Sequence, residues 1–218
     1  MKRFRSLPLL VLSACILVAS ALSVAAPCPP EGQGSRNDPK QNVLKNRDTA
    51  PPSYEQMTVG QFEKTFKKNL KLPTRRENFT EAQLAPVAPS EQRGVTLTGY
   101  VLRAVKQGPE TANCESPTRS DIHVWLYSKT STDKAERTKL RGYAVVSEVT
   151  PGWQDNHPTW TAANLEKLAK DRVKVRVSGW VMYDPEHPPH LGKTRGTLWE
   201  LHPITKIEIQ NNGAWQEL

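Results

Sequence analysis

The stretch that decides the fold is Gly94-Val95-Thr96-Leu97-Thr98-Gly99-Tyr100-Val101. Apolar residues occupy every second position in it, which is the pattern of a β-strand with one buried face. Further strands are expected within residues 121–127, 143–150, 173–182 and 198–210. A helix begins after Thr161 in this reading, since Leu165, Leu168 and Ala169 fall on one helical face. The predicted order is therefore strand, strand, strand, helix, strand, strand.

Five strands of this kind each need one dry face, and they close most economically into a small barrel. A helix between the third and fourth strands is the arrangement of the OB fold, whose strands run in the order 1-2-3-5-4 around the wall. We therefore predict an all-β domain with one helix, a small five-stranded OB-like barrel (β-β-β-α-β-β) over residues 93–210. Residues 211–218 are expected to form a C-terminal tail.

Residues 26–92 precede this barrel and are rich in Pro, Gly, Asn and charge. Such a composition buries too little apolar surface to offset chain entropy, so we predict a largely disordered region and linker. One short helix is expected near residues 58–71, because Thr58 and Gln61 fit a capping box. Its apolar face would consist of Val59, Phe62, Phe66 and Leu70. We expect this face to pack on the barrel, although the lysines beside it also allow a membrane or nucleic-acid contact.

Four strings carry a resemblance to a known group: Asp121-Ile122-His123-Val124, Glu148-Val149-Thr150-Pro151, Gly179-Trp180-Val181-Met182-Tyr183-Asp184 and Thr197-Leu198-Trp199-Glu200-Leu201-His202-Pro203. Through them, residues 94–210 resemble uncharacterised exported bacterial proteins with an OB-like domain. The resemblance implies a fold and no activity. Staphylococcal-type nucleases also use this fold, but the dense Asp, Arg and Glu pattern of their active site is not recognisable here.

The first 25 residues have the features of a signal peptide, with Lys2, Arg3 and Arg5 before an apolar run and small residues up to Ala25. They predict export to the periplasm or secretion, with no transmembrane span in the mature chain. The string Leu12-Ser13-Ala14-Cys15 resembles a lipobox, so a lipid anchor at Cys15 is the alternative. Removal of residues 1–25 would lower the net charge from +8 to +5, which gives weak support for a polyanionic partner.

Three cysteines exclude a disulfide scaffold and a four-thiolate zinc site. Cys28 and Cys114 would remain in the mature chain. In an oxidising compartment they could pair and tie the N-terminal region to the barrel, or they could stay as two unpaired thiols.

Period-two arithmetic on the second, third and fifth barrel strands aims one set of side chains outward on a shared face. This set contains Asp121, His123, Glu148, Glu200 and His202. This set could bind a divalent metal ion, with His123, Glu148 and His202 as the candidate metal-coordinating residues. The sequence contains no closely spaced metal-binding motif here. The other interpretation is a set of hydrogen bonds and ion pairs that stabilise an exposed sheet face.

Aromatic and basic residues are expected on the same outer surface. Trp125, Tyr127 and Trp180 could stack on bases or sugars, and Arg195 could meet a phosphate or carboxylate. OB-fold proteins bind oligonucleotides and oligosaccharides on this surface. The alternative for each tryptophan is packing beneath a loop or the N-terminal helix.

These patterns favour an exported binding module that recognises an oligomeric or anionic ligand on the face of strands 2, 3 and 5, without a required cofactor. A metal-dependent hydrolase and a structural protein of the cell envelope are the alternatives. The sequence contains no G-x-S-x-G turn, no P-loop and no dinucleotide fingerprint.

Overall fold

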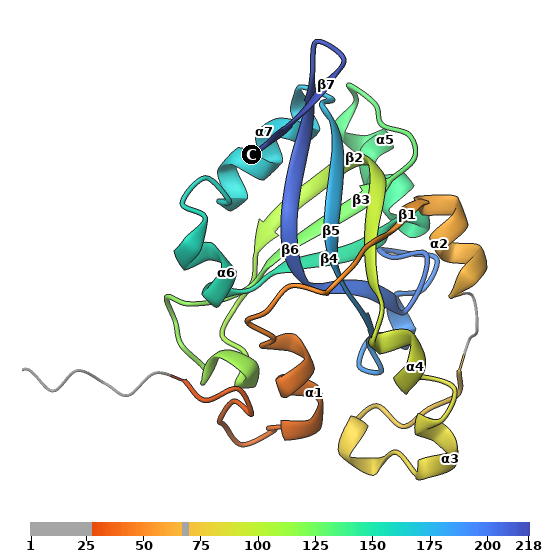
Figure 1. Cartoon of the computed structure of the whole chain (residues 1–218), viewed down its shortest axis with the longest axis vertical. Coiled ribbons are helices and arrows are strands. Elements are labelled where there is room, and N and C mark those ends of the chain that lie inside the picture. The colour runs from red at the N-terminus through yellow and green to blue at the C-terminus, as the bar shows by residue number, and fades with distance from the viewer. Residues whose placement is uncertain (1–27, 67–69) are drawn as a thin grey trace, which may run out of the picture.

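Five strands close into a mixed β-barrel in the computed structural model, which describes residues 28–66 and 70–218 (Figure 1). The barrel strands are β2 (Gly94–Lys106), β3 (Ile122–Tyr127), β4 (Val145–Val149), β5 (Lys174–Tyr183) and β6 (Trp199–Asn211). They are arranged as β2-β3-β4-β6-β5, and β5 pairs back with β2 to close the wall. Only the β4–β6 contact in this wall is parallel. The predicted barrel and its strand order are confirmed.

Two further strands extend the sheet beyond the barrel. β1 (Glu55–Thr58) runs parallel to β2, and β7 (Ala214–Glu217) forms a hairpin with β6. The hairpin turn is made by Asn212 and Gly213, which both have positive φ, the backbone that a tight two-residue turn requires. The C-terminal residues expected to be a tail are therefore mostly a strand.

The prediction of one helix in the barrel domain and one before it is wrong. The described residues contain seven α-helices, which are α1 (Pro39–Lys45), α2 (Val59–Thr65), α3 (Glu81–Leu84), α4 (Ala88–Glu91), α5 (Lys134–Leu140), α6 (Pro151–Asn156) and α7 (Ala162–Lys170). Most of them are too short for a periodic apolar face to be visible in the sequence. Several of the helices begin after an N-cap residue whose side chain accepts a hydrogen bond from a backbone N–H group of the first turn. Examples are Asp38 before α1 and Asp133 before α5.

The described part of the N-terminal region is folded against the barrel, contrary to the expected disorder. It contributes buried side chains such as Phe62, Phe79 and Val87 to the core, and it also makes buried polar contacts. Arg76 is 4% exposed and forms an ion pair with Glu91, which is 2% exposed. Gln41 of α1 accepts a hydrogen bond from Nε of Arg76 at 2.7 Å. Average composition does not show that a few apolar side chains of this region are placed in the core and that its buried polar groups find partners on the barrel.

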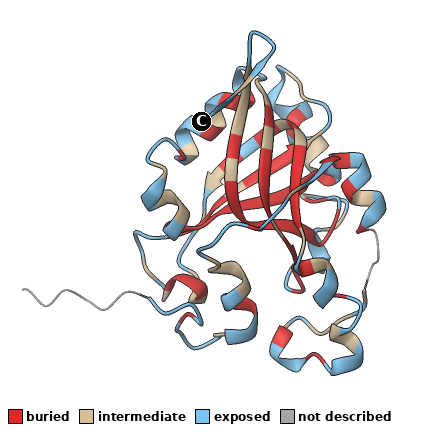
Figure 2. Cartoon of the chain, viewed as in Figure 1, coloured by how far each residue is buried: buried red, intermediate tan, exposed pale blue. Residues whose placement is uncertain are grey.

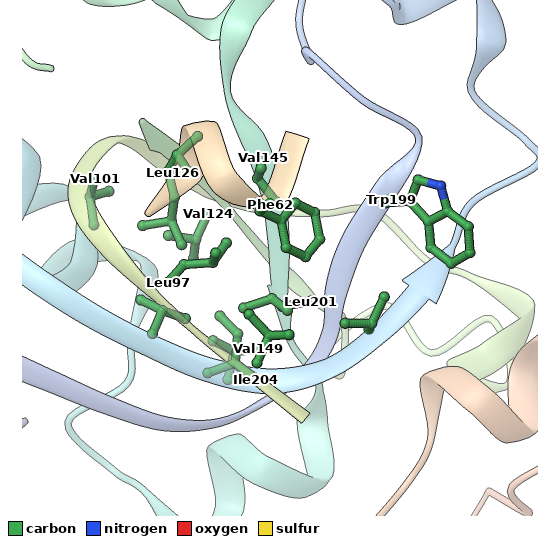
Figure 3. Close-up of a cluster of buried hydrophobic side chains, with 14 of the residues drawn as sticks. Phe62, Leu97, Val101, Val124, Leu126, Val145, Val149, Trp199, Leu201 and Ile204 are labelled. Carbon is green, nitrogen blue, oxygen red and sulfur yellow. The ribbon is translucent and has the colours of Figure 1, made fainter. Parts of the chain in front are cut away.

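The barrel interior is filled by aliphatic side chains from all five strands, and α2 adds an aromatic ring to them (Figures 2 and 3). Thr58 and Gln61 form the predicted capping box. Val59, Phe62 and Phe66 are buried as predicted, and Phe62 belongs to the same core cluster as Val145 and Leu126 (Figure 3). The helix ends at Thr65, and residues 67–69 lie outside the described residues.

Cys28 and Cys114 form a disulfide, with their Cα atoms 5.8 Å apart. The pairing considered from the sequence is confirmed, and it ties the start of the described chain to the loop before β3. The predicted signal peptide, including Cys15, lies outside the described residues. Among the helices of the described part, none has the length and apolar character needed to cross a membrane.

Replacing Phe62 with Ala should lower the free energy of unfolding by about 3–5 kcal/mol, because the substitution leaves a cavity in a closed core. Chemical denaturation followed by circular dichroism measures this change. Lys64→Ala, at an exposed position of the same helix, is the control and should change it by less than about 0.5 kcal/mol. Equal effects of the two substitutions would contradict the burial of Phe62.

Replacing Cys28 with Ser should lower the free energy of unfolding by about 2–4 kcal/mol, because the disulfide closes a long loop in the unfolded chain. The two cysteines are 86 residues apart in sequence. Cys114→Ser should have the same effect, as should reduction of the wild-type protein, measured by urea unfolding. A wild-type protein whose stability did not respond to reductant would argue against the disulfide.

Candidate functional site

Three neighbouring strands bring the predicted acids and imidazoles together. His123 of β3 lies directly opposite Glu148 of β4, and β4 runs beside β6, which carries Glu200 and His202. All four side chains lie on the outer side of the barrel wall, as the alternation predicted. They are nevertheless not exposed to solvent, because the N-terminal region and the loop after β5 cover them.

We call the resulting group the buried cluster, which consists of Asp121, His123, Glu148, Asp184, Arg195, Glu200 and His202. His202 is at its centre and is 0% exposed. Its Nδ1 lies 3.2 Å from Oε1 of Glu200 and 3.4 Å from Oε2 of Glu148, and its Nε2 lies 3.4 Å from Oδ2 of Asp121. His202 therefore faces three carboxylates at once.

His123 and Asp121 of the buried cluster each contact a neighbouring side chain. Nε2 of His123 lies 2.9 Å from Oε1 of Glu148. Asn113 donates a hydrogen bond from Nδ2 to Oδ1 of Asp121 at 2.9 Å. Imidazoles and carboxylates thus alternate from His123 through Glu148 and His202 to Asp121.

Arg195 lies at the other end of the buried cluster, where it forms an ion pair with Asp184 and lies 3.4 Å from Oε2 of Glu200. It is 4% exposed, so the proposed role of meeting a phosphate from solvent is wrong for this residue. Its charge is used to compensate buried acids. Asp184 also accepts from Nδ1 of His187 at 2.6 Å.

Lys45 of α1 is part of the cover and was missed by the sequence analysis. Its ammonium lies 3.5 Å from Glu110 and 3.6 Å from Glu186, and its side chain is 13% exposed. The helix lies beneath the barrel in the view of Figure 1. The position of Lys45 is explained by its ion pairs with acids that lie far away in the sequence. No pattern in the sequence around Lys45 could therefore have predicted this role.

The charges of the buried cluster strongly shift its pKa values. Burial by itself would lower the pKa of His202, but the carboxylates of Glu148, Asp121 and Glu200 raise it to about 10. Burial disfavours a charged Glu148, yet His123 and His202 hold the pKa of this carboxyl well below its usual range. For Glu200, burial and the neighbouring charge of Glu148 raise the pKa. The site therefore strongly favours added positive charge.

Three of these residues could hold a metal ion. Ligand atoms of Asp121, Glu148 and His202 all lie within 4.8 Å of one another. Asp121 thus takes the place that the sequence analysis gave to His123, whose imidazole instead contacts Glu148. The alternation in the sequence predicted Asp121 on the same face as His123. Spacing alone could not show which of the two residues would lie closer to Glu148 and His202 as a metal ligand.

The aromatic residues expected to stack on a ligand are engaged within the protein. Trp125 is 9% exposed, and its Nε1 donates to the carbonyl of Thr194 at 2.6 Å. Trp180 is half-buried under the guanidinium of Arg47, which lies 4.6 Å from the ring centroid. Tyr127 is half-buried, with its ring 6.1 Å from that of Tyr143. The packing alternative considered for the tryptophans fits this arrangement.

A small pocket of about 250 Å³ lies between β2, α5 and α7, and we call it the cationic pocket. Its charged lining residues are Arg103, Lys134, Arg137, Arg141 and Glu166. Glu166 is the one acidic residue in this lining, and its Oε2 accepts a hydrogen bond from the backbone N–H of Ala104 at 2.9 Å. The pocket therefore carries an excess of positive charge, and no local pattern in the sequence predicts it because these residues are spread over three segments.

A second pocket of about 960 Å³ lies beside the disulfide, and we call it the disulfide pocket. Asn113 lines it, and the same side chain donates to Asp121 of the buried cluster. Arg119, also in its lining, is paired with Asp155 at 2.6 Å. The disulfide pocket thus ends one side chain away from the buried cluster.

The chain matches no family model, no curated protein and no solved structure with which it was compared. The interpretation of the site therefore depends on its geometry and charge.

The pKa values of the neighbouring residues His187 and His190 should be shifted in opposite directions. The hydrogen bond to Asp184 raises the pKa of His187 above 6.5, whereas burial and the charge of His187 lower the pKa of His190. NMR titration of the imidazole protons should therefore give His187 the higher pKa of the two. The reverse order would contradict the contact between His187 and Asp184.

The raised pKa of His187 also makes the stability of the protein depend on pH. A raised pKa in the folded state means that His187 stabilises the protein fully below about pH 6.5 and that this contribution is lost as pH rises through the folded-state pKa. The free-energy difference between wild type and His187→Gln should therefore shrink as pH rises above 6.5, with His190→Gln as the control. Urea unfolding at a series of pH values measures it.

Proposed function

We propose that this chain is an exported OB-like binding module for a ligand that carries an anionic group. The strand order β2-β3-β4-β6-β5, with α7 between β4 and β5, supports the OB-like assignment. The disulfide between Cys28 and Cys114 supports an oxidising compartment such as the periplasm or the exterior. The signal peptide at residues 1–25, with a lipid anchor at Cys15 as its alternative, belongs to the same proposal.

The observation that carries the proposal is the cationic pocket. Arg137 is 6% exposed and donates from Nη1 to the carbonyls of Ser131 and Thr132, while its Nε is buried and has no hydrogen-bond partner among the residues that the structure describes. Nε of Arg141 is also buried without a partner. Buried donors of this kind are costly unless a ligand or water accepts from them. A phosphate or carboxylate group would supply acceptors and negative charge together.

Trp125 connects the pocket to the predicted binding surface. The guanidinium of Arg141 lies 5.3 Å from the centroid of the Trp125 ring, so Trp125 positions a cation of the pocket instead of stacking on a ligand itself. The ligand-binding surface in this proposal is thus the outer wall beside β2 and β3. The face of β3, β4 and β6 is less suitable because its acids and imidazoles are buried.

The pocket volume limits what it can hold. At about 250 Å³ it suits a small anion or a single anionic group of a larger ligand, such as one phosphate of an oligonucleotide or one carboxylate of an acidic oligosaccharide. The hydrolase alternative is weaker, since a catalytic group must touch its substrate. His123, Glu148 and His202 do converge, but His202 is 0% exposed and Glu148 is 4% exposed.

Binding of an anion should change the fluorescence of Trp125, because its ring contacts Arg141. We expect saturable binding of inorganic phosphate or a short oligonucleotide, which weakens as salt is added. Arg141→Gln should lower the affinity about tenfold or more, since a hydrogen bond to a charged group contributes about 1.5–3 kcal/mol. Fluorescence titration of the full chain measures both effects.

Arg119→Gln is the matched control, because this arginine lies in the disulfide pocket and is already paired with Asp155. A neutral oligosaccharide is the control ligand. Equal binding by wild type and Arg141→Gln would refute the cationic pocket as the site. No response to any anion would leave the structural role in the cell envelope as the better interpretation.

A further inference from the structure

The centre of the buried cluster has the composition of a metal site. Asp121, Glu148 and His202 are 1%, 4% and 0% exposed, and their ligand atoms lie within 4.8 Å of one another. They come from the start of β3, from β4 and from β6, so the rigid barrel wall sets their relative positions. One imidazole and two carboxylates form a ligand set used for zinc and manganese.

Two polar atoms at this centre are buried and form no hydrogen bond with any other group of the described residues. They are Oδ2 of Asp121 and Nε2 of His202, which lie 3.4 Å apart. Buried polar atoms without a partner are uncommon and costly, and they indicate an ion, a water molecule or a functional role. Both atoms are of types that bind metal ions, and they face each other across 3.4 Å.

The balance of charge also favours binding of a cation. Four carboxylates of the cluster, those of Asp121, Glu148, Asp184 and Glu200, are each at most 4% exposed. Arg195 is the only permanently charged cation within the cluster, and Lys45 approaches from its cover. Lys45 is itself paired with Glu110 and Glu186, so the four carboxylates outnumber the permanent cations beside them, which favours an added cation.

Each of the three proposed metal-coordinating side chains also contacts a second residue that fixes its orientation. Oε1 of Glu200 lies 3.2 Å from Nδ1 of His202, Nε2 of His123 lies 2.9 Å from Glu148, and Nδ2 of Asn113 lies 2.9 Å from Asp121. A carboxylate behind a histidine ligand fixes the ring so that its other nitrogen faces the metal. Such outer contacts are typical of metal sites and are not required for an isolated ion pair.

We propose that the chain binds one divalent transition ion, Zn²⁺ or Mn²⁺, through the carboxylates of Asp121 and Glu148 and through the imidazole of His202. The ion enters from the disulfide pocket past Asn113, which borders both the pocket and Asp121. Three protein ligands leave a coordination position open for water. This site is separate from the cationic pocket, and the two proposals can fail independently.

The test uses the full chain with its disulfide intact, stripped with a chelator and dialysed. Calorimetric titration with ZnCl₂ and, separately, with MnCl₂ should show saturable binding of about one equivalent of at least one ion. Asp121→Asn should weaken it at least about tenfold. This substitution removes the charged ligand but keeps an oxygen that can accept the hydrogen bond of Asn113, so the fold should be retained.

His190→Gln is the matched control, because His190 is exposed and lies beside His187, where a surface ion could also bind. It should leave the affinity unchanged. Loss of binding in His190→Gln, or wild-type affinity in Asp121→Asn, would place the ion elsewhere and overturn the proposal. Absence of stoichiometric binding of both ions to the wild-type chain would overturn it without any variant.

If Asp121→Asn does not fold, the wild-type protein still decides the question. Nitrogen-15 NMR of labelled histidines should show a large shift of a ring nitrogen of His202 when Zn²⁺ is added, with His190 unchanged. A shift confined to His187 and His190 would refute the site.

Discussion

The feature on which the rest of this structure depends is the compensation of buried charge along β3, β4 and β6. Four nearly inaccessible carboxylates lie on the outer wall of the barrel, and each faces an imidazole, a guanidinium or an amide. Removing one partner from such a group leaves an uncompensated charge, at a cost of about 3–5 kcal/mol. The loop of Asp184 and Arg195 and the helix that carries Lys45 are therefore tied to this wall.

This constraint explains why the N-terminal region is folded although its composition is typical of disorder. The region places a small set of apolar side chains in the core, and in addition Lys45 meets two acids and Arg76 pairs with Glu91 in a buried setting. The disulfide at Cys28 holds its start against the loop before β3. The barrel thus provides the partners that the segment lacks on its own.

The molecule separates its two polar sites by charge. The buried cluster is acidic and enclosed, which suits a small cation, whereas the cationic pocket is open and suits an anion. They lie against different strands, β6 for the first and β2 for the second. An anionic ligand would be repelled from the buried cluster, so the observed charges favour one kind of occupant at each site.

The sequence by itself determined the barrel, its strand order and the side of the wall on which His123, Glu148, Glu200 and His202 lie, because a period of two encodes the facing of a strand directly. The capping box at Thr58 was equally local and was also correct. Only the tertiary structure decided that this side is covered, that Asp121 joins Glu148 and His202, and that Arg141 and Arg137 share a pocket. Those facts depend on loops and on residues far apart in the chain, whose pairing is selected by charge and burial in three dimensions and leaves no periodic trace in one.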